Sequence, residues 1–268
     1  MSSKEKVRLT ELLVSRGLSE NVAEAERAIL AGDVLGDDAP LTQPGMTVDS
    51  RLTLRIKPHG RYVSRGGDKL FGALRDFAFD PAGLHCLDVG ASTGGFTDCL
   101  LQQGAASVVA VDVAYGQFAW QLRSDKRVRL FERTNIRDID PDLAGAPFDV
   151  AVVDLSFVSL RSALPALAPF LAEGGMLIAL VKPQFELAAS LVAGGVVIDK
   201  AAHVQALEQV IEAALRSGLA PQAATFSQIK GPKGNIEFFL LAQRGGIPAT
   251  IDTLNVVDAA HEGLGVGQ

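Results

Sequence analysis

The sequence predicts an α/β fold: a Rossmann-like, doubly wound, mostly parallel sheet with an antiparallel edge strand, preceded by a small α+β domain. Three observations lead to this prediction. From residue 64 onward, apolar runs of strand length alternate with amphipathic helical stretches, as in parallel sheets with helical crossovers. A glycine-rich turn joins the first of these runs to a helix. The last two runs have no helix between them.

Residues 1–58 are expected to form the small domain. Helices are expected over 7–15 and 21–30, where apolar residues recur at helical spacing and glycines follow, and short strands over 33–35 and 52–56. Asp37 and Asp38 belong to a turn between these elements. Residues 59–63, which include Gly60, are typical of a linker.

The large domain is expected to span residues 64–268. Its strands are expected over 85–89, 107–113, 128–133, 149–155, 175–182, 223–229 and 236–243, and its principal helices over 96–103, 160–171 and 202–217. In such a fold, ligands bind in the crevice at the carboxyl ends of the strands. The last two strands follow each other closely, which predicts a hairpin and therefore an antiparallel strand at the sheet edge.

The composition of the 268 residues is that of a folded globular protein, with 48% hydrophobic and 21% charged residues. The most apolar long window, residues 163–181, is interrupted by prolines, glycines and Glu173, so no membrane span and no membrane partner are expected. The polar N-terminus does not resemble a signal peptide, which favours the cytoplasm. Cys86 and Cys99 form neither a disulfide framework nor a metal cluster, and no metal is expected.

The strongest local signal is the segment from Asp88 to Phe96, which leaves an apolar strand and enters a helix. Glycines there let the backbone turn sharply and approach a ligand, and a helix N-terminus offers free N–H groups. Asp112 follows about 20 residues on, where an acidic side chain can hold the two hydroxyls of a ribose. These features predict a site for an adenosine-type cofactor. A bulky side chain at Gly94 or Gly95 is expected to block the approach of that cofactor without unfolding the domain.

Two other functions fit parts of this segment. A nicotinamide cofactor is possible in such a fold, but the loop lacks the G-x-G-x-x-G spacing. The run Gly90–Gly94 also matches the G-x-S-x-G elbow of serine hydrolases, with Asp154 and His203 downstream in the right order. Against a hydrolase, the elbow follows the first strand of its domain, and no His-Gly-Gly oxyanion loop is present.

Four charged residues stand where the strand pattern ends. Asp154 and Lys182 each follow an apolar strand, Glu237 precedes the last strand, and Lys69 opens the helix before the first strand. Because the last strand should run antiparallel, all four are expected at the cofactor edge. A ribose hydroxyl is a very weak acid, so its methylation needs a base and close alignment. A lysine can act as that base where its pKa falls, and carboxylates can orient it.

At these residues the chain resembles the TlyA hemolysin/rRNA methyltransferase family, whose catalytic domain is related to the FtsJ ribose 2′-O-methyltransferases. The resemblance is most specific in residues 63–70, 88–96, 132–135, 154–157 and 182–186. It implies S-adenosylmethionine as cofactor and ribosomal RNA or ribosomal subunits as partner, with cytidine 2′-hydroxyls methylated. The oligomeric state stays open.

The resemblance also implies roles for individual residues. The catalytic tetrad would be Lys69, Asp154, Lys182 and Glu237, and the cofactor residues Asp88, Gly90, Ala91, Ser92, Thr93, Gly94, Gly95, Phe96, Asp112, Asn135 and Asp154. The first 58 residues resemble a small RNA-binding domain named after a ribosomal protein of the small subunit. The RNA-binding residues would be Arg8, Arg16, Arg27, Arg61 and Arg65.

The charge of the chain is unusual for an RNA-binding protein. The net charge is −6, and residues 1–58 contain eight Lys and Arg against nine Asp and Glu. Because attraction to phosphates supplies most non-specific RNA affinity, we expect the linker and the rim of the catalytic domain to make more of the RNA contact. The family's older name implies a rival function, a membrane-active hemolysin, which would need an inserting segment that the sequence does not contain.

Overall fold

The computed structural model describes residues 6–30, 32–56, 60–231 and 233–265, and the chain forms two compact units, Met1–Gly60 and Arg61–Gln268. The boundary expected at residue 58 and the linker expected to start at residue 59 fall on residues 57–59, which lie outside the described residues. The side chain of Arg27 is likewise not described.

The small unit packs two helices on short antiparallel strands. Its helices are α1 (Leu9–Ser15) and α2 (Val22–Leu30); its strands are β1 (Lys6–Arg8), β2 (Val34–Gly36), β3 (Ala39–Pro40), β4 (Thr47–Asp49) and β5 (Leu54–Ile56). Leu9, Leu13 and Ile29 are fully buried in its core. The first helix begins two residues later than expected because Val7 pairs with Val48 in a ladder between β1 and β4.

The turn of Asp37 and Asp38 is confirmed. Leu35 pairs with Pro40 and Gly36 with Ala39, which leaves a two-residue connection between β2 and β3. Both aspartates have positive φ, 44° and 68°. Positive φ at both positions defines the type I′ hairpin turn, in which aspartate is tolerated.

The large unit contains one seven-stranded sheet with the order β11-β12-β10-β9-β6-β7-β8. The strands are β6 (His85–Val89), β7 (Ser107–Val111), β8 (Val128–Phe131), β9 (Phe148–Val153), β10 (Leu171–Val181), β11 (Leu219–Phe226) and β12 (Phe238–Arg244). The neighbours from β10 to β8 are all parallel. The predicted doubly wound, mostly parallel α/β fold is therefore confirmed.

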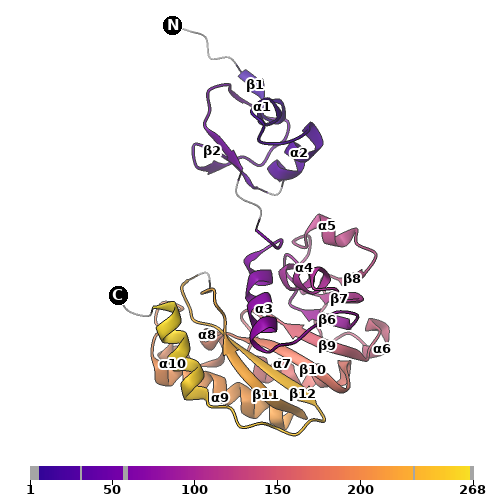
Figure 1. Ribbon diagram of the computed structural model, residues 1–268, viewed down its shortest axis with the longest axis vertical. Helices are drawn as coiled ribbons and strands as arrows, with labels where there is room; N and C mark the ends of the chain where they lie inside the picture. The colour runs from indigo at the N-terminus through magenta and orange to yellow at the C-terminus, as the bar shows by residue number, and fades with distance from the viewer. Residues whose placement is uncertain (1–5, 31, 57–59, 232, 266–268) are drawn as a thin grey trace. The chain divides into compact units, whose positions relative to one another are not determined.

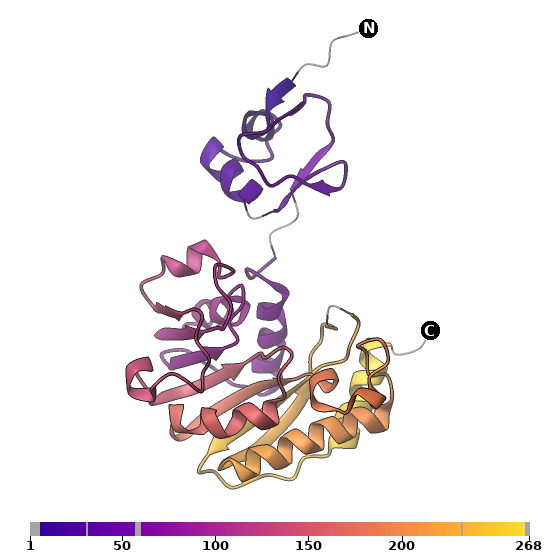
Figure 2. The same ribbon diagram turned by 180° about the vertical axis from the view of Figure 1, so that it is seen from behind.

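Helices cover both faces of this sheet (Figures 1 and 2). One face is covered by α3 (Arg65–Asp76) and α4 (Gly95–Gln102), and the other by α7 (Leu160–Leu167), α9 (Lys200–Arg216) and α10 (Thr253–Leu264). Three one-turn helices, α5 (Trp120–Arg123), α6 (Pro141–Ala144) and α8 (Pro183–Glu186), lie in the connections. Strand residues alternate between two apolar clusters; Val150 and Val152 belong to one, Ala151 and Val153 to the other.

The sequence predicts an antiparallel strand at the edge of the sheet. In the structure the antiparallel strand, β12, is instead the second strand from that edge. β12 pairs antiparallel with both β10 and β11, so the edge strand β11 runs parallel to β10. The crossover through α9 leaves room for a strand between β10 and β11, and the chain returns into that gap. Val181 of β10 pairs with Phe238 of β12, which places Lys182 and Glu237 next to each other beyond the carboxyl end of β10.

Candidate active site

The loop after β6 lies against the end of β9. Gly90 has φ +84°, and a Cβ atom there would overlap the backbone carbonyl oxygen of Asp154. The amide of Asp154 donates a hydrogen bond to the carbonyl of Val89 over 2.9 Å. The close approach of the ends of β6 and β9 therefore requires glycine at position 90. The same approach brings the predicted cofactor loop next to Asp154, a carboxylate of the predicted tetrad.

The reason for glycine at positions 94 and 95 differs from the expectation. A Cβ atom at Gly94 would overlap Leu122 and lie 3.0 Å from the Phe118 ring, and one at Gly95 would overlap the Ser64 hydroxyl. Gly94 also has φ +93°. A side chain at either position would first strike the protein itself, so substitution here disturbs packing and is not a clean test of cofactor binding.

A cavity of about 440 Å³ lies beside the ends of β6, β7 and β9. Apolar Val111, Val113 and Ile136 line it together with Asp112 and Asn135. The two oxygens of Asp112 accept hydrogen bonds from the Ser92 and Ala114 amides, each over 2.6 Å. An apolar slot with the Asp112 carboxylate and the Asn135 amide among its polar groups matches the chemistry of an adenosine: a flat base and two ribose hydroxyls.

A second cavity of about 790 Å³ contains the tetrad. Lys69 Nζ lies 2.5 Å from Glu237 Oε2, and these two side chains are 9% and 1% exposed. Lys182 Nζ lies 2.5 Å from Asp154 Oδ1 and 3.0 Å from Ser156 Oγ. The structure therefore places all four residues around one space as two largely buried lysine–carboxylate pairs.

The two cavities meet. Both are lined by Gly90, Ser92, Asp154, Ser156 and Phe157. A group bound in the smaller cavity therefore borders the space that holds the lysines. A cofactor in the smaller cavity would therefore face an acceptor in the larger one.

Two of the predicted cofactor residues, Asp88 and Gly94, line neither cavity, and Asp88 is the one with an unusual environment. It is fully buried, and Oδ2 accepts a hydrogen bond from the Thr97 hydroxyl over 2.6 Å. Within the described residues Oδ1 has no hydrogen-bond partner. Burial, reinforced by the charges of Asp154 and Asp112, raises the pKa of Asp88 to about 7.

Asp88→Asn is expected to change how stability depends on pH. Because the pKa of Asp88 is raised on folding, ionisation opposes the folded state, and wild-type stability falls as pH rises from about 4 through about 7. The variant lacks this ionisation and keeps an acceptor for Thr97, so its advantage should grow between pH 5 and pH 8, by at most about 3 kcal/mol. Thermal or urea unfolding of both proteins at both pH values measures it. A stability difference that stays constant with pH would contradict the assignment.

The serine hydrolase interpretation is wrong. Asp154 pairs with Lys182, and His203 is fully buried with Nδ1 2.9 Å from His261 Nε2. Burial, and then the neighbouring His261, lower the pKa of His203 to about 4. Neither residue is arranged to activate Ser92. The two cysteines are buried, and burial raises the pKa of each thiol to about 12, so both stay protonated.

The arginines that the resemblance assigns to RNA binding differ from one another in what their side chains contact. Arg65 lines the tetrad cavity, and its guanidinium donates to the Lys230 carbonyl over 2.6 Å. Arg61 stacks on Phe71, 3.8 Å from the ring centroid. In the small unit, Arg16 donates to the carbonyls of Leu52 and Ser50, while Arg8 is exposed in β1. Arg16 thus holds its own unit together.

The motif-based predictions did not assign a role to several residues at the site. Ser156 contacts Lys182; Phe157 is 89% exposed with φ +63° and lies against Phe185, with ring centroids 5.2 Å apart. Each lies within a few residues of a tetrad member, which is the signal that could have identified them.

Comparison with known proteins agrees with this geometry. Residues 62–244 match the family model described as FtsJ-like methyltransferase. The 16S/23S rRNA (cytidine-2′-O)-methyltransferase TlyA of Mycobacterium tuberculosis is 41% identical over 98% of each chain. The YqxC protein of Bacillus subtilis is 43% identical over 98% of this chain and 97% of its own.

A solved structure from Streptococcus thermophilus that carries a hemolysin name is 39% identical, covers 97% of this chain and 98% of its own, and superposes with a TM-score of 0.74. These relatives confirm the resemblance that the motifs indicated. The chain belongs to the FtsJ-like methyltransferase family.

Proposed function

We propose that this protein transfers the methyl group of S-adenosylmethionine to a ribose 2′-hydroxyl of ribosomal RNA, that of a cytidine. The observation that carries the proposal is the presence of two lysine–carboxylate contacts in the tetrad cavity, one of which, Lys182–Asp154, borders the smaller cavity. Methylation of an unprotonated ring nitrogen of a base would not need this arrangement, because such a nitrogen can attack the methyl group without losing a proton. A ribose hydroxyl needs its proton removed.

The smaller cavity fits the adenosine part of the cofactor. Asp112 would hold the ribose hydroxyls, and Asn135 and Ile136 would lie beside the base. The loop from Gly90 to Gly95 would lie along the remainder, with the N-terminus of α4 offering free amides. The cofactor supplies an electrophilic methyl group; the protein has to bring the acceptor oxygen to it.

The proton of the 2′-hydroxyl would pass to Lys182 Nζ while this ammonium group gives one of its own protons to Asp154, so that the Asp154 carboxylate ends as the proton acceptor. Asp154 and Ser156 fix Lys182 Nζ at the junction of the cavities, so that the hydroxyl it binds faces the smaller cavity. Lys69 and Glu237 lie across the same space and are held by each other. Alignment of this kind can account for much of the rate of such a transfer.

The rim of the site suits a nucleic acid in spite of the net charge of −6. Arg65 and Lys233 border the tetrad cavity, and Arg137 borders the smaller one. Among the described residues, none of the three has a carboxylate partner within ion-pair distance. Phe157 offers an exposed ring on which a base could stack. The small unit would add contacts through Arg8, which is exposed.

The proposal is tested by methyl transfer from labelled S-adenosylmethionine to ribosomal subunits, naked ribosomal RNA and transfer RNA. Label is expected in ribosomal RNA, in subunits or naked, and not in transfer RNA. A protein that binds the cofactor but labels none of the ribosomal substrates would contradict it. For the rival hemolysin function, no helix in the described part of the chain is long and apolar enough to cross a membrane.

A further inference from the structure

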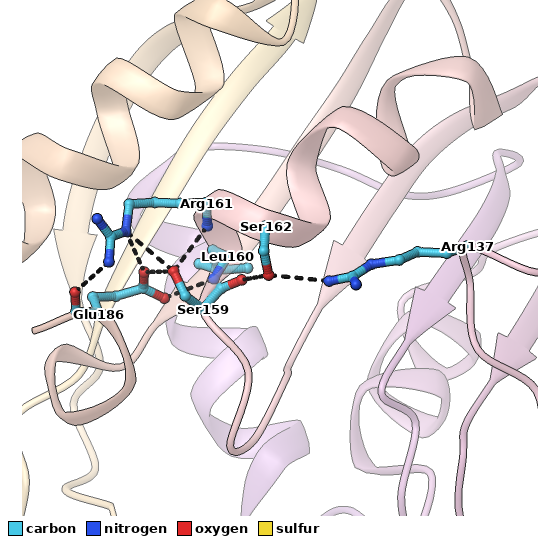
Figure 3. A network of polar contacts seen from close by, with 6 residues as sticks. All are labelled: Arg137, Ser159, Leu160, Arg161, Ser162 and Glu186. Atoms are coloured by element: carbon cyan, nitrogen blue, oxygen red, sulfur yellow. Dashed lines mark hydrogen bonds and ion pairs between the residues drawn. The ribbon is translucent and has the colours of Figure 1, made fainter.

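Glu186 is a buried carboxylate that the proposed chemistry does not use. Its side chain is 1% exposed and lies at the end of α8, four residues after Lys182. Figure 3 shows it pointing at the N-terminus of α7, where it contacts Ser159, Leu160 and Arg161. A buried carboxylate is costly unless it is well bonded, so these contacts need a reason.

The contacts of Glu186 are numerous and specific. Oε1 accepts the Leu160 amide over 2.8 Å, and Oε2 accepts the Ser159 hydroxyl. Arg161 Nε lies 3.6 Å from Oε2, and its Nη2 donates to the Glu186 backbone carbonyl over 2.8 Å. Both oxygens and the backbone of Glu186 are thus attached to one turn, residues 159–161.

These contacts join the two loops that contain the reactive groups. The first loop, residues 154–160, contains Asp154 and Phe157; the second, residues 182–186, contains Lys182 and Phe185. At one end they are connected by the Lys182–Asp154 ion pair, in the middle by the Phe157–Phe185 ring contact, and at the far end by Glu186. The loops therefore have three successive connections, and only the far one lies outside the tetrad cavity.

The first loop has a conformation that needs support. Phe157 has φ +63°, a left-handed conformation that is costly for a residue with a bulky side chain. Its ring is 89% exposed, so burial of the side chain does not hold it. The anchor that follows it, Ser159 and Leu160 bound to Glu186, fixes the end of the loop. Without this anchor, the loop can relax and carry Asp154 and Ser156 away from Lys182.

We infer that Glu186 is a positioning residue for the methyl transfer: its carboxylate clamps the two loops together and so fixes Lys182 against Asp154. This inference rests on the proposed function, because it assigns a role within that reaction. If Glu186 were only a helix cap, its replacement would lower stability and leave the rate of transfer unchanged. A positioning residue affects the rate of transfer more than the binding of cofactor, because the rate falls steeply when reacting groups are misplaced, whereas residues 154–158 are only part of the lining of the smaller cavity.

The test compares Glu186→Ala with Glu186→Gln. The alanine variant should lose kcat by on the order of 100-fold, the cost of a misplacement of about 1 Å, with a smaller change in the KM for S-adenosylmethionine. Glutamine keeps an acceptor for the Leu160 amide and can donate to Ser159, so Glu186→Gln should retain most of the wild-type kcat. Ser159→Ala, which removes one contact, should fall between them and serves if the alanine variant does not fold.

Val257→Ala is the matched control, because Val257 is fully buried in α10, away from both cavities. It should lower the melting temperature and leave kcat unchanged. Hydrogen exchange gives a readout that needs no activity: residues 154–160 and 182–187 should exchange faster in Glu186→Ala and not in Val257→Ala.

Three outcomes would overturn the inference: wild-type kcat in Glu186→Ala, an equal loss in the glutamine variant, or an equal loss in Val257→Ala at the same stability. If the wild-type protein labels no ribosomal RNA, the proposed function fails instead. The exchange experiment then still decides whether Glu186 clamps the loops.

Discussion

Replacing Lys182 by methionine is expected to lower the rate of methyl transfer by about 10²- to 10⁴-fold, the usual contribution of a positioned acid or base. Methionine has nearly the same length and shape, so the cavity stays filled while the ammonium group is lost. Lys182 Nζ contacts Asp154 and Ser156 at the junction of the cavities, and the predicted cofactor contacts of Asp112 and Asn135 lie elsewhere. Single-turnover kinetics should therefore show a slow chemical step with cofactor affinity close to that of the wild type.

Lys200→Met is the matched control for this substitution. Lys200 also pairs with an aspartate, Asp258, over 2.6 Å, but it is half-exposed on α9 and lines neither cavity. Loss of this lysine should leave the rate unchanged, because it lies outside both cavities. It should also change stability little, since an exposed ion pair contributes about 1 kcal/mol or less. If Lys182→Met transfers methyl groups at nearly the wild-type rate, the role assigned to Lys182 is wrong.

Replacing Glu237 by alanine is expected to be severe in two ways. It leaves the ammonium group of Lys69 buried without its partner, which typically costs about 3–5 kcal/mol of stability. It also removes one of the two lysine–carboxylate pairs of the tetrad cavity, so transfer should be largely lost. Urea unfolding measures the first effect, and the labelling assay measures the second.

The double variant Lys69→Met with Glu237→Leu separates these two effects. Two apolar side chains of similar size can replace a buried ion pair with little loss of stability. The double variant should therefore regain most of the stability that Glu237→Ala loses and remain inactive. Recovery of activity along with stability would mean that this pair serves only the fold.

The parts of the site that the sequence predicts best are those that depend on strand ends. Asp154 and Lys182 follow buried strands, and parallel strands end at one edge, so their meeting follows from the pattern alone. Glu237 was predicted there because a strand without a preceding helix must return antiparallel. The register between Val181 and Phe238 confirms that reasoning.

Features that depend on tertiary packing could not be predicted in this way. The position of β12 between β10 and β11 depends on the space left by the α9 crossover. The sequence attributes the glycine at position 94 to the approach of a ligand. In the structure the groups that exclude a side chain there are Leu122 and Phe118, more than 20 residues away in sequence. Glu186 belonged to a recognisable motif, but its partners on α7 are visible only in three dimensions.

The chemical identity of the methylated nucleoside decides whether the methyl group goes to a cytidine 2′-hydroxyl or to a base. Ribosomal RNA labelled by the protein is digested to nucleosides and separated, and a parallel sample is hydrolysed in alkali. The proposed function predicts label in 2′-O-methylcytidine and an alkali-resistant dinucleotide, because a methylated 2′-oxygen cannot attack the neighbouring phosphate. Label in a base-methylated nucleoside, with every phosphodiester cleaved by alkali, would contradict it.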